Sequence, residues 1–248
     1  MVEPSIVRWP IPNGHWVVQS DPCSSERGYG GSPMFSRSTN TVVPVVTIHS
    51  NFGATETSYV GGQEIHGQGE WADQIYEVVR GAVRSYKVLS DGRRQICAFH
   101  LPNDIFGWEN GPAHRFTAEA IVDTTVRVVR RQILEYVATT DVQVTHNLLS
   151  MATKNLEHAE NQMMLLGQRN SLERVAAFLL EMDQRLSGAD VLALPMSRRD
   201  IADYLGLSVE TVSRELSQLR SLGILKFAEN SQRRIVLKDR QKLQGFNS

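Results

Sequence analysis

The chain has 248 residues, of which 41% are hydrophobic and 21% are charged, and its formal net charge at pH 7 is −1. This length and this share of hydrophobic residues suffice for one large domain, or two smaller ones, with a buried core. The net charge excludes a strongly basic or acidic chain. It does not exclude a polyanionic partner, because local charge guides such binding.

Charge is divided unevenly along the chain. Residues 169–248 contain 13 Lys and Arg against 10 Asp and Glu, a net charge of +3. The remaining residues contain 13 against 17, a net charge of −4. This mild asymmetry permits a nucleic-acid partner for the C-terminal part.

The two cysteines, Cys23 and Cys97, lie far apart and belong to no CxxC pair or Cys/His cluster with metal-ligand spacing. A disulfide framework and a cysteine-ligated iron–sulfur cluster are therefore not expected. The N-terminus shows no basic leader before an apolar core, and no apolar run approaches membrane-spanning length. These features predict a cytoplasmic protein in a reducing compartment, without a membrane partner.

Two segments precede the first helical pattern. Residues 1–45 are rich in Gly, Ser, Pro and Asn and lack a sustained period, so we expect a flexible N-terminal tail. Residues 46–138 contain short alternating runs, beginning with DQIYEVVRGAVRSYKVL on both sides of Gly81 and continuing with QICAFHL, FTAEAIV and TTVRVVRR. Short strands at a spacing of about 8–12 residues each bury one face, which predicts an all-β roll or barrel.

A long helix is predicted within residues 139–168. Apolar residues recur there at steps of three and four and form one stripe: Leu148, Ala152, Leu156, Ala159, Met163 and Leu166. The stripe has two interpretations. It packs on the chain's own roll, or it forms a two-helix seam between subunits, where the small Ala152 and Ala159 allow close approach. A two-fold symmetric DNA-binding protein would favour the seam.

Residues 169–242 form a second predicted domain, which begins with a helix in NSLERVAAFLLEMDQRL, for which Ser171 is a plausible N-cap. A helix-turn-helix motif is predicted at residues 198–217: Ser197 and Asp200 resemble a capping box, Gly206 ends the first helix and Ser208 caps the second. Beyond it, GILKF and RRIVL flank a polar stretch and predict a β-hairpin wing.

The second helix of this motif carries the strongest functional signal. Glu210, Ser213 and Arg214 lie at i, i+3 and i+4, so they share one helix face. Arg214 can donate two hydrogen bonds to guanine, Glu210 can accept one from cytosine, and Ser213 can reach a neighbouring A·T pair. A solvated helix face with a Glu–Arg pair is the alternative interpretation. The two caps, the turn glycine and the wing favour DNA.

Phosphate contacts are predicted for three further residues. Ser208 and Thr211 lie near the start of the second helix, and Arg198 lies on the preceding one. Such side chains fix the register of a protein on DNA without reading its sequence.

Two long motifs, YEVVRGAVRSYKVLSDGRRQICAFHLPNDIFG and SRRDIADYLGLSVETVSREL, resemble the CRP/FNR family of bacterial transcription regulators, and within it the FixK-type activators of rhizobia. The resemblance covers about residues 45 to 240. It implies an α+β fold with an N-terminal cyclic-nucleotide-binding-like β-roll (a double-stranded β-helix or jelly roll) of eight strands, a long dimerisation helix and a C-terminal winged helix-turn-helix. It also implies a homodimer on palindromic double-stranded DNA, which favours the seam, and contacts with RNA polymerase.

The resemblance also suggests what the chain reads and controls. The E-x-x-S-R pattern of the FNR branch falls on Glu210, Ser213 and Arg214, and that branch reads sites resembling TTGAT–N4–ATCAA. Val209 stands where the cyclic-AMP branch has an arginine, which argues against a cyclic-AMP-type half-site. FixK-type activators are controlled mainly through their own synthesis, under an oxygen-responsive two-component system. They switch on genes for microaerobic respiration and nitrogen fixation.

The predicted roll departs from the family's ligand-binding patterns. Glu109 is shifted, only five residues separate it from Arg115, and Phe116 stands in place of a phosphate-binding serine. Cyclic nucleotide binding is therefore not expected. Cys23 cannot replace the cysteine cluster of an iron–sulfur regulator, so no cofactor is expected.

Two other functions remain open at this stage. One is a regulator of the same family whose roll binds a small effector or whose Cys97 is oxidised, although a buried apolar role for this residue is favoured. The other is a cupin-like metalloenzyme, which needs a close H-x-H that EIHGQGE lacks. We expect structural roles for His66, His100 and His114, and no enzymatic activity.

Overall fold

The structure, a computed structural model, describes residues 53–168, 170–186, 191–228 and 233–246, all within one unit of the chain that begins at Val43. The expected N-terminal tail lies outside the described residues, as do Cys23 and the turn of the predicted wing. None of the described helices has an apolar stretch that could cross a lipid bilayer.

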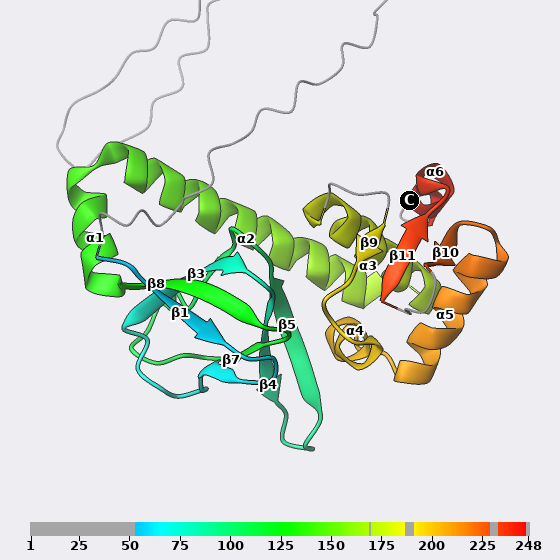
Figure 1. Ribbon diagram of the computed structural model, residues 1–248, viewed down its shortest axis with the longest axis horizontal. Helices are drawn as coiled ribbons and strands as arrows, with labels where there is room; N and C mark the ends of the chain where they lie inside the picture. Colours follow the sequence, from blue (N-terminus) through cyan, green and yellow to red (C-terminus); the bar gives the residue numbers. More distant parts are fainter. Residues whose placement is uncertain (1–52, 169, 187–190, 229–232, 247–248) are drawn as a thin grey trace, which may run out of the picture. The chain divides into compact units, whose positions relative to one another are not determined.

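Eight strands between Thr55 and Arg130 form two antiparallel four-stranded sheets, which confirms the predicted roll (Figure 1). The first sheet has the order β1-β8-β3-β6 and the second the order β2-β7-β4-β5. The strands are β1 Thr55–Tyr59, β2 Glu64–His66, β3 Gln74–Arg80, β4 Val83–Val88, β5 Arg94–His100, β6 Ile105–Phe106, β7 Thr117–Ala120 and β8 Thr124–Arg130.

Gly81 separates β3 from β4, as the alternating sequence on both sides of it predicts. Its φ angle is +91°, a backbone conformation that residues with a side chain rarely adopt. A Cβ atom at this position would collide with Thr124 of β8. Both requirements favour glycine where the chain passes from one sheet to the other.

Two helices follow the roll: α1 Arg131–Thr140 and α2 Val142–Gln168. Asp141 between them has an extended backbone, and its Oδ1 atom accepts hydrogen bonds from the backbone N–H groups of Gln143 and Val144, at 2.8 and 3.3 Å. The helical period that begins after Arg131 therefore corresponds to two helices, because Asp141 caps the second.

The long helix α2 has a packed side and an exposed side. Leu148 packs on the buried cluster of Ile75, Val129 and Leu134. On the other side, large apolar residues recur at every seventh position with high exposed fractions: Val142 (85%), Leu149 (65%), Leu156 (60%) and Met163 (69%). Leu148, which the predicted stripe included, thus belongs to the packed side of α2. Its neighbour Leu149 lies on the exposed side.

The C-terminal part is a winged helix. It consists of α3 Ser171–Arg185, β9 Leu192–Ala193, α4 Arg198–Leu205, α5 Val209–Ser221, β10 Leu225–Phe227, β11 Arg234–Leu237 and α6 Arg240–Gly245. Strands β10 and β11 pair antiparallel, as the wing prediction requires, and β9 adds a third strand.

The N-cap of α3 differs from the prediction. Asn170, not Ser171, caps the helix, because its side-chain oxygen accepts from the Glu173 backbone N–H. The Glu173 carboxylate in turn accepts from the backbone N–H and the side-chain amide of Asn170. The Ser171 hydroxyl instead donates to the carboxylate of Glu215 on α5, at 2.7 Å. The first residue of α3 therefore connects two helices of the winged domain.

Apolar packing joins the roll to the winged helix. Phe99 of β5 lies in one buried cluster with Phe178 of α3 and Tyr204 of α4, with ring-centroid distances of 6.2 Å to Phe178 and 5.0 Å to Tyr204. The two parts of the fold thus share a hydrophobic core.

Candidate nucleic-acid interface

Helices α4 and α5 form the predicted helix-turn-helix. Ser197 caps α4 through a capping box with Asp200, and Ser208 caps α5 by accepting a hydrogen bond from the Thr211 backbone N–H at 3.1 Å. Gly206 ends α4 with a φ angle of +63°, in the left-handed conformation that suits glycine. These caps satisfy backbone groups that short helices otherwise leave unpaired, so the sequence itself fixes the turn.

The interior of the motif is apolar. Ile201, Ala202 and Leu205 of α4 and Val212 and Leu216 of α5 are each at most 3% exposed. The small Ala202 also accepts, through its carbonyl, the backbone N–H of the turn residue Leu207 at 3.0 Å. This packing leaves the opposite side of α5 to carry polar residues.

The exposed face of α5 presents the three predicted base-reading residues. Glu210 is exposed, and hydrogen bonds from its own backbone N–H and from the Ser208 side chain hold its pKa below the ordinary value. Ser213 is half-buried and its hydroxyl accepts a hydrogen bond from Arg198 Nη1 at 3.1 Å. The Arg214 side chain is 69% exposed. One helix face therefore holds an ionised acceptor, a hydroxyl and a guanidinium.

Glu215 is a residue of this site that the sequence interpretation missed. It is 4% exposed, and its Oε1 atom accepts from Arg214 Nε at 3.3 Å and Nη2 at 2.9 Å, and from the Ser171 hydroxyl. The carboxylate thus holds one edge of the guanidinium of Arg214. Its position could have been noticed, because an acid three residues after Val212 and four before Leu219 falls on the buried side of α5.

Two cations beside this face lie close together without a carboxylate partner among the described residues. The guanidinium carbons of Arg198 and Arg220 lie 5.6 and 5.8 Å from the ring centroid of Phe227 in the wing strand β10. The buried Nε atom of Arg198 has no hydrogen-bond partner in the described structure. Burial and the charge of Arg220 lower the pKa of Arg198. An anion would relieve this repulsion, so the pair is suited to a phosphate group.

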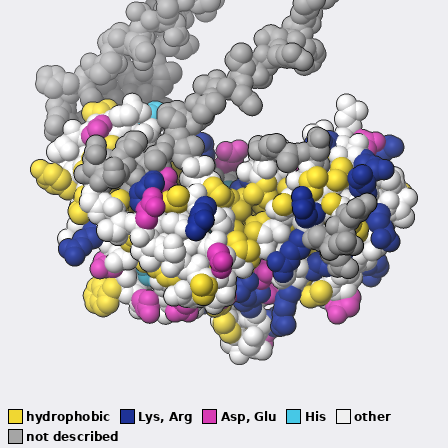
Figure 2. All heavy atoms as spheres, in the orientation of Figure 1, with side chains coloured by type: hydrophobic (Ala, Val, Ile, Leu, Met, Phe, Trp, Pro, Cys, Tyr) yellow, Lys and Arg dark blue, Asp and Glu magenta, His cyan; other side chains and the backbone are white. Residues whose placement is uncertain are grey.

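The remaining predicted phosphate contacts, Ser208 and Thr211, lie at the start of α5. Their hydroxyls are 3.1 Å apart, next to the positive end of the helix dipole. Figure 2 shows Lys and Arg side chains gathered over the winged-helix part of the molecule more densely than over the roll. The predicted phosphate-binding residues therefore lie beside the face that carries Glu210, Ser213 and Arg214.

The roll shows different chemistry at the position where the family would hold a nucleotide phosphate. Arg115 donates through Nε to Glu109 Oε2 at 2.7 Å and through its backbone N–H to Oε1 at 3.1 Å. Glu109 is buried, and its carboxylate already forms an ion pair with the guanidinium of Arg115. The pair fits a phosphate ligand poorly.

The histidines and the cysteine of the roll lie in its interior packing. His66 and His114 are buried and stack with ring centroids 3.5 Å apart, and His100 Nε2 lies 2.8 Å from the Ser85 hydroxyl. Cys97 is half-buried in β5, and burial raises the pKa of its thiol, which disfavours the reactive thiolate. Among the described residues, no group of three or more His, Cys, Asp or Glu side chains could hold a metal ion.

Comparisons with known proteins agree with this architecture. Residues 56–141 match a family model described as a cyclic nucleotide-binding domain, and residues 173–246 match a Crp-like helix-turn-helix domain. The chain is 42% identical over 168 residues to the nitrogen fixation regulation protein FixK of Rhizobium meliloti, covering 68% of this chain and 76% of that protein. It is 40% identical over 199 residues to FixK of Azorhizobium caulinodans, covering 78% and 79%.

A solved structure of FixK2 from Bradyrhizobium japonicum is also similar. It is 59% identical in sequence, covers 79% of this chain and 98% of its own, and superposes with a TM-score of 0.75. The likeness thus extends across the roll, the long helix and the winged helix.

Proposed function

This chain belongs to the CRP/FNR family of transcription regulators, as a FixK-type member that binds DNA through its helix-turn-helix, and we propose that it acts as a homodimeric activator of microaerobic respiration and nitrogen-fixation genes. Its proposed target is a palindrome resembling TTGAT–N4–ATCAA. The observation that carries this proposal is the exposed face of α5, where Glu210, Ser213 and Arg214 stand together beside Arg198 and Arg220, two cations that have no carboxylate partner among the described residues.

Base reading is assigned to three side chains. Glu215 holds the Nε–Nη2 edge of Arg214, which leaves the outer Nη atoms to donate to guanine O6 and N7. The ionised Glu210 accepts from cytosine N4, so the two residues read one G·C pair from both strands. Ser213 reaches the neighbouring A·T pair. Arg198, Ser208 and Thr211 bind phosphates and set the register.

We assign the contact between the two protomers of the homodimer to helix α2. Val142, Leu149, Leu156 and Met163 repeat every seven residues on its exposed side, and Ala152 and Ala159 fall at the intervening positions of the same heptad. Such a stripe is costly to leave in water and suits a two-stranded seam with closely spaced helices. Leu166 continues the seam at the C-terminal end of α2. Leu149 is assigned to the seam in place of Leu148, because Leu149 is exposed whereas Leu148 packs within its own chain.

The seam can be tested by sedimentation. Leu156→Lys places a charge on the exposed stripe and should convert dimers to monomers at micromolar concentration. Asn161→Lys is the matched control, because Asn161 is also exposed on α2 but lies at the f position of this heptad, away from the stripe. Equal sedimentation of both variants and the parent chain would place the dimer contact elsewhere.

The physiological part of the proposal is supported by the names of the relatives, two of which are nitrogen fixation regulation proteins. Activation requires a surface that contacts RNA polymerase, and we propose that exposed loops of the roll and of residues 172–196 supply it. The closed Glu109–Arg115 pair supports control without a cyclic nucleotide. The protein's own abundance would then set its activity.

The deciding experiment is DNA binding by the purified chain at fixed salt without a cofactor. One duplex carries TTGAT–N4–ATCAA, and a second has both G·C pairs replaced by A·T. Tight binding to the first duplex alone would support the proposal. Equal binding to both duplexes would refute the assigned base reading.

A further inference from the structure

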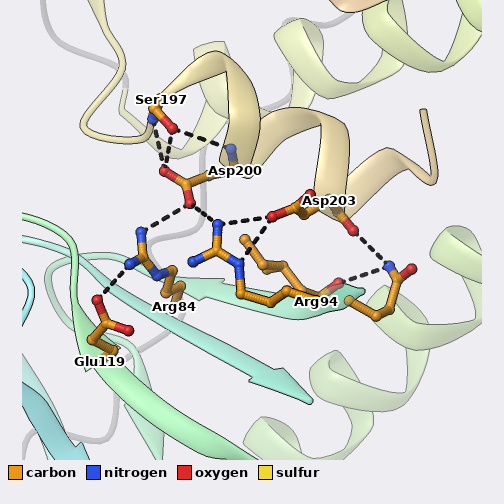
Figure 3. A network of polar contacts seen from close by, with 8 residues as sticks. Arg84, Arg94, Glu119, Ser197, Asp200 and Asp203 are labelled. Carbon is orange, nitrogen blue, oxygen red and sulfur yellow. Dashed lines mark hydrogen bonds and ion pairs between the residues drawn. The ribbon is translucent and has the colours of Figure 1, made fainter. Parts of the chain in front are cut away.

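A polar network joins the roll to α4, the first helix of the helix-turn-helix (Figure 3). Arg84 of β4 donates through Nη1 to Asp200 Oδ1 at 2.8 Å, and its Nη2 atom pairs with Glu119 of β7. Arg94 of β5 donates through Nη2 to the same Asp200 oxygen at 2.6 Å and through Nε to Asp203 Oδ2 at 2.9 Å. Two arginines of one sheet thus hold two carboxylates of one helix.

This network is shielded from water where it meets α4. The Asp200 side chain is 4% exposed, and those of Arg84 and Arg94 are 15% and 23% exposed. Burial opposes the ionisation of Asp200, but hydrogen bonds from Ser197 and the charges of both arginines hold its pKa below the ordinary value. A buried carboxylate is tolerated only with such partners. Removing an arginine would therefore leave the negative charge of Asp200 buried with less compensating positive charge.

Asp200 has a second task within α4. Its Oδ2 atom accepts from the Ser197 backbone N–H at 2.9 Å and from the Ser197 hydroxyl at 2.7 Å, which completes the capping box. Through one carboxylate, the start of α4 is fixed both to its own cap and to the roll.

The roll also contacts the later part of α4. Gln95 of β5 donates through Nε2 to the backbone carbonyl of Asp203 at 2.8 Å. The rings of Phe99 and Tyr204 pack with centroids 5.0 Å apart. Because the contacts are spread along α4, the helix cannot turn on the roll without breaking several of them.

The position of α4 is transmitted to α5. Arg198 on α4 donates to the Ser213 hydroxyl on α5 at 3.1 Å, and the turn is closed by the hydrogen bond from Leu207 to Ala202. Buried apolar residues fill the space between the two helices. A displacement of α4 would therefore move the base-reading face of α5 with it.

We propose that Arg84 and Arg94 are positioning residues for DNA binding: they hold α4 on the roll and fix the orientation in which each protomer presents α5 to its half-site. The inference rests on the proposed function, because it concerns a dimer that reads a palindrome. Every partner in the network is a side chain or a carbonyl of the chain itself.

This role has a consequence for the DNA site. When one recognition helix is bound, a fixed orientation raises the effective concentration of the second helix at its own half-site. It also selects one spacing between half-sites. Binding to a single half-site needs no fixed orientation between protomers. Loosening the network should therefore weaken palindrome binding and leave half-site binding unchanged.

The test compares Arg94→Gln with the matched control Arg93→Gln. The Arg93 side chain is 78% exposed and pairs with Asp91 in the same turn, away from α4. Full-length chains are titrated at fixed salt with the palindrome, with a duplex carrying one half-site, and with palindromes whose spacer is one base pair shorter or longer. For Arg94→Gln we expect about a tenfold loss on the palindrome, half-site affinity within about twofold of the parent, and a weaker spacer preference.

Asp203→Asn provides a second variant in case Arg94→Gln does not fold, as judged by circular dichroism. It removes the charge of one Arg94 partner and keeps the Asp200 cap intact. A folded variant with parental palindrome affinity and spacer preference would overturn the proposal. So would an equal loss on half-site and palindrome, which would show damage to the reading surface. Failure of the parent chain to prefer the intact palindrome would instead reject the proposed function.

Discussion

Helix α5 and the roll each contain an exposed arginine that forms an ion pair with a buried glutamate. The Arg214 and Arg115 side chains are 69% and 72% exposed, and the side chains of their partners Glu215 and Glu109 are 5% and 8% exposed. The N–O distances are 2.9 and 2.7 Å. The two pairs are nearly the same in chemistry and burial. Their surroundings must therefore explain any difference in what they bind.

Those surroundings carry opposite charge. Next to Arg115, burial lowers the pKa of His114 while the carboxylates of Glu109, Glu70 and Asp73 oppose that shift, so the local field is negative. Beside α5, Arg198 experiences the positive charge of Arg220. We therefore expect a polyanion to bind less favourably beside Arg115 than beside α5. An arginine–glutamate pair alone therefore does not identify an anion-binding site.

The largest expected effect separates the two pairs directly. Arg214→Ala should cost about 1–3 kcal/mol of DNA-binding free energy per half-site, because it removes the donors to guanine. Arg115→Ala is the matched control and should leave DNA affinity unchanged. Fluorescence anisotropy with the intact palindrome and with the duplex lacking G·C pairs measures both variants.

The same measurement tests the role of Arg214. Its replacement should weaken binding to the intact palindrome and have little effect on the duplex without G·C pairs. Similar losses on both duplexes would show that Arg214 contacts phosphate and not a base.

Acid should destabilise the roll by the next largest amount. Burial lowers the pKa of His66 to about 3, with smaller contributions from His114 and His100, and burial also lowers the pKa of His100 to about 3. Both rings are neutral in the folded chain, whereas the unfolded chain takes up protons below about pH 6.5. Their contribution to stability is thus complete above pH 6.5 and is lost as pH falls towards 3. Between pH 6.5 and 5 the loss is at most about 2 kcal/mol per histidine.

Urea unfolding at several pH values measures this loss. His66→Phe, which keeps an aromatic ring against His114 and Tyr76, should flatten the pH dependence. His146→Gln serves as the control, because His146 is exposed on α2. If the free energy of unfolding of His66→Phe depends on pH as steeply as that of the parent chain, His66 does not contribute to the loss of stability in acid.

Loss of a phosphate contact should have a smaller and uniform effect. Arg198→Ala should weaken binding to every duplex by a similar factor, because phosphates carry no sequence information. The slope of log K against log salt should also become shallower by about 0.9 per lost contact. Arg93→Ala, on an exposed turn of the roll, is the control. A loss confined to the intact palindrome would assign Arg198 to base reading.

Much of the fold could be predicted from the sequence because its signals are local. Ser197 with Asp200, Gly206 and Ser208 are capping and turn residues whose effect depends on neighbours within four positions. Alternation on both sides of Gly81 likewise marks two strands. The short strands β2 and β6 have only three and two residues, too few to show a period, so no alternating run marks them in the sequence.

The less predictable features depend on contacts between distant residues. Arg84 and Asp200 are separated by 116 positions, and no spacing rule relates them. The same holds for Ser171 and Glu215, which are 44 positions apart and joined by a hydrogen bond. The helix face with Glu210, Ser213 and Arg214 follows from helical periodicity alone, whereas the residues that hold it in place required the tertiary structure.

The smallest expected effect concerns cyclic nucleotides at the roll. Because Glu109 neutralises Arg115 and the nearby Glu70 and Asp73 add negative charge, cyclic AMP at millimolar concentration should not change the melting temperature or DNA affinity. Differential scanning fluorimetry with and without cyclic AMP measures the first quantity, and 5′-AMP controls for nonspecific binding. A rise in melting temperature with cyclic AMP that is lost in Arg115→Ala would show that the pair opens to bind phosphate. The contrast between the two arginine–glutamate pairs would then lie in their ligands and not in their surrounding charge.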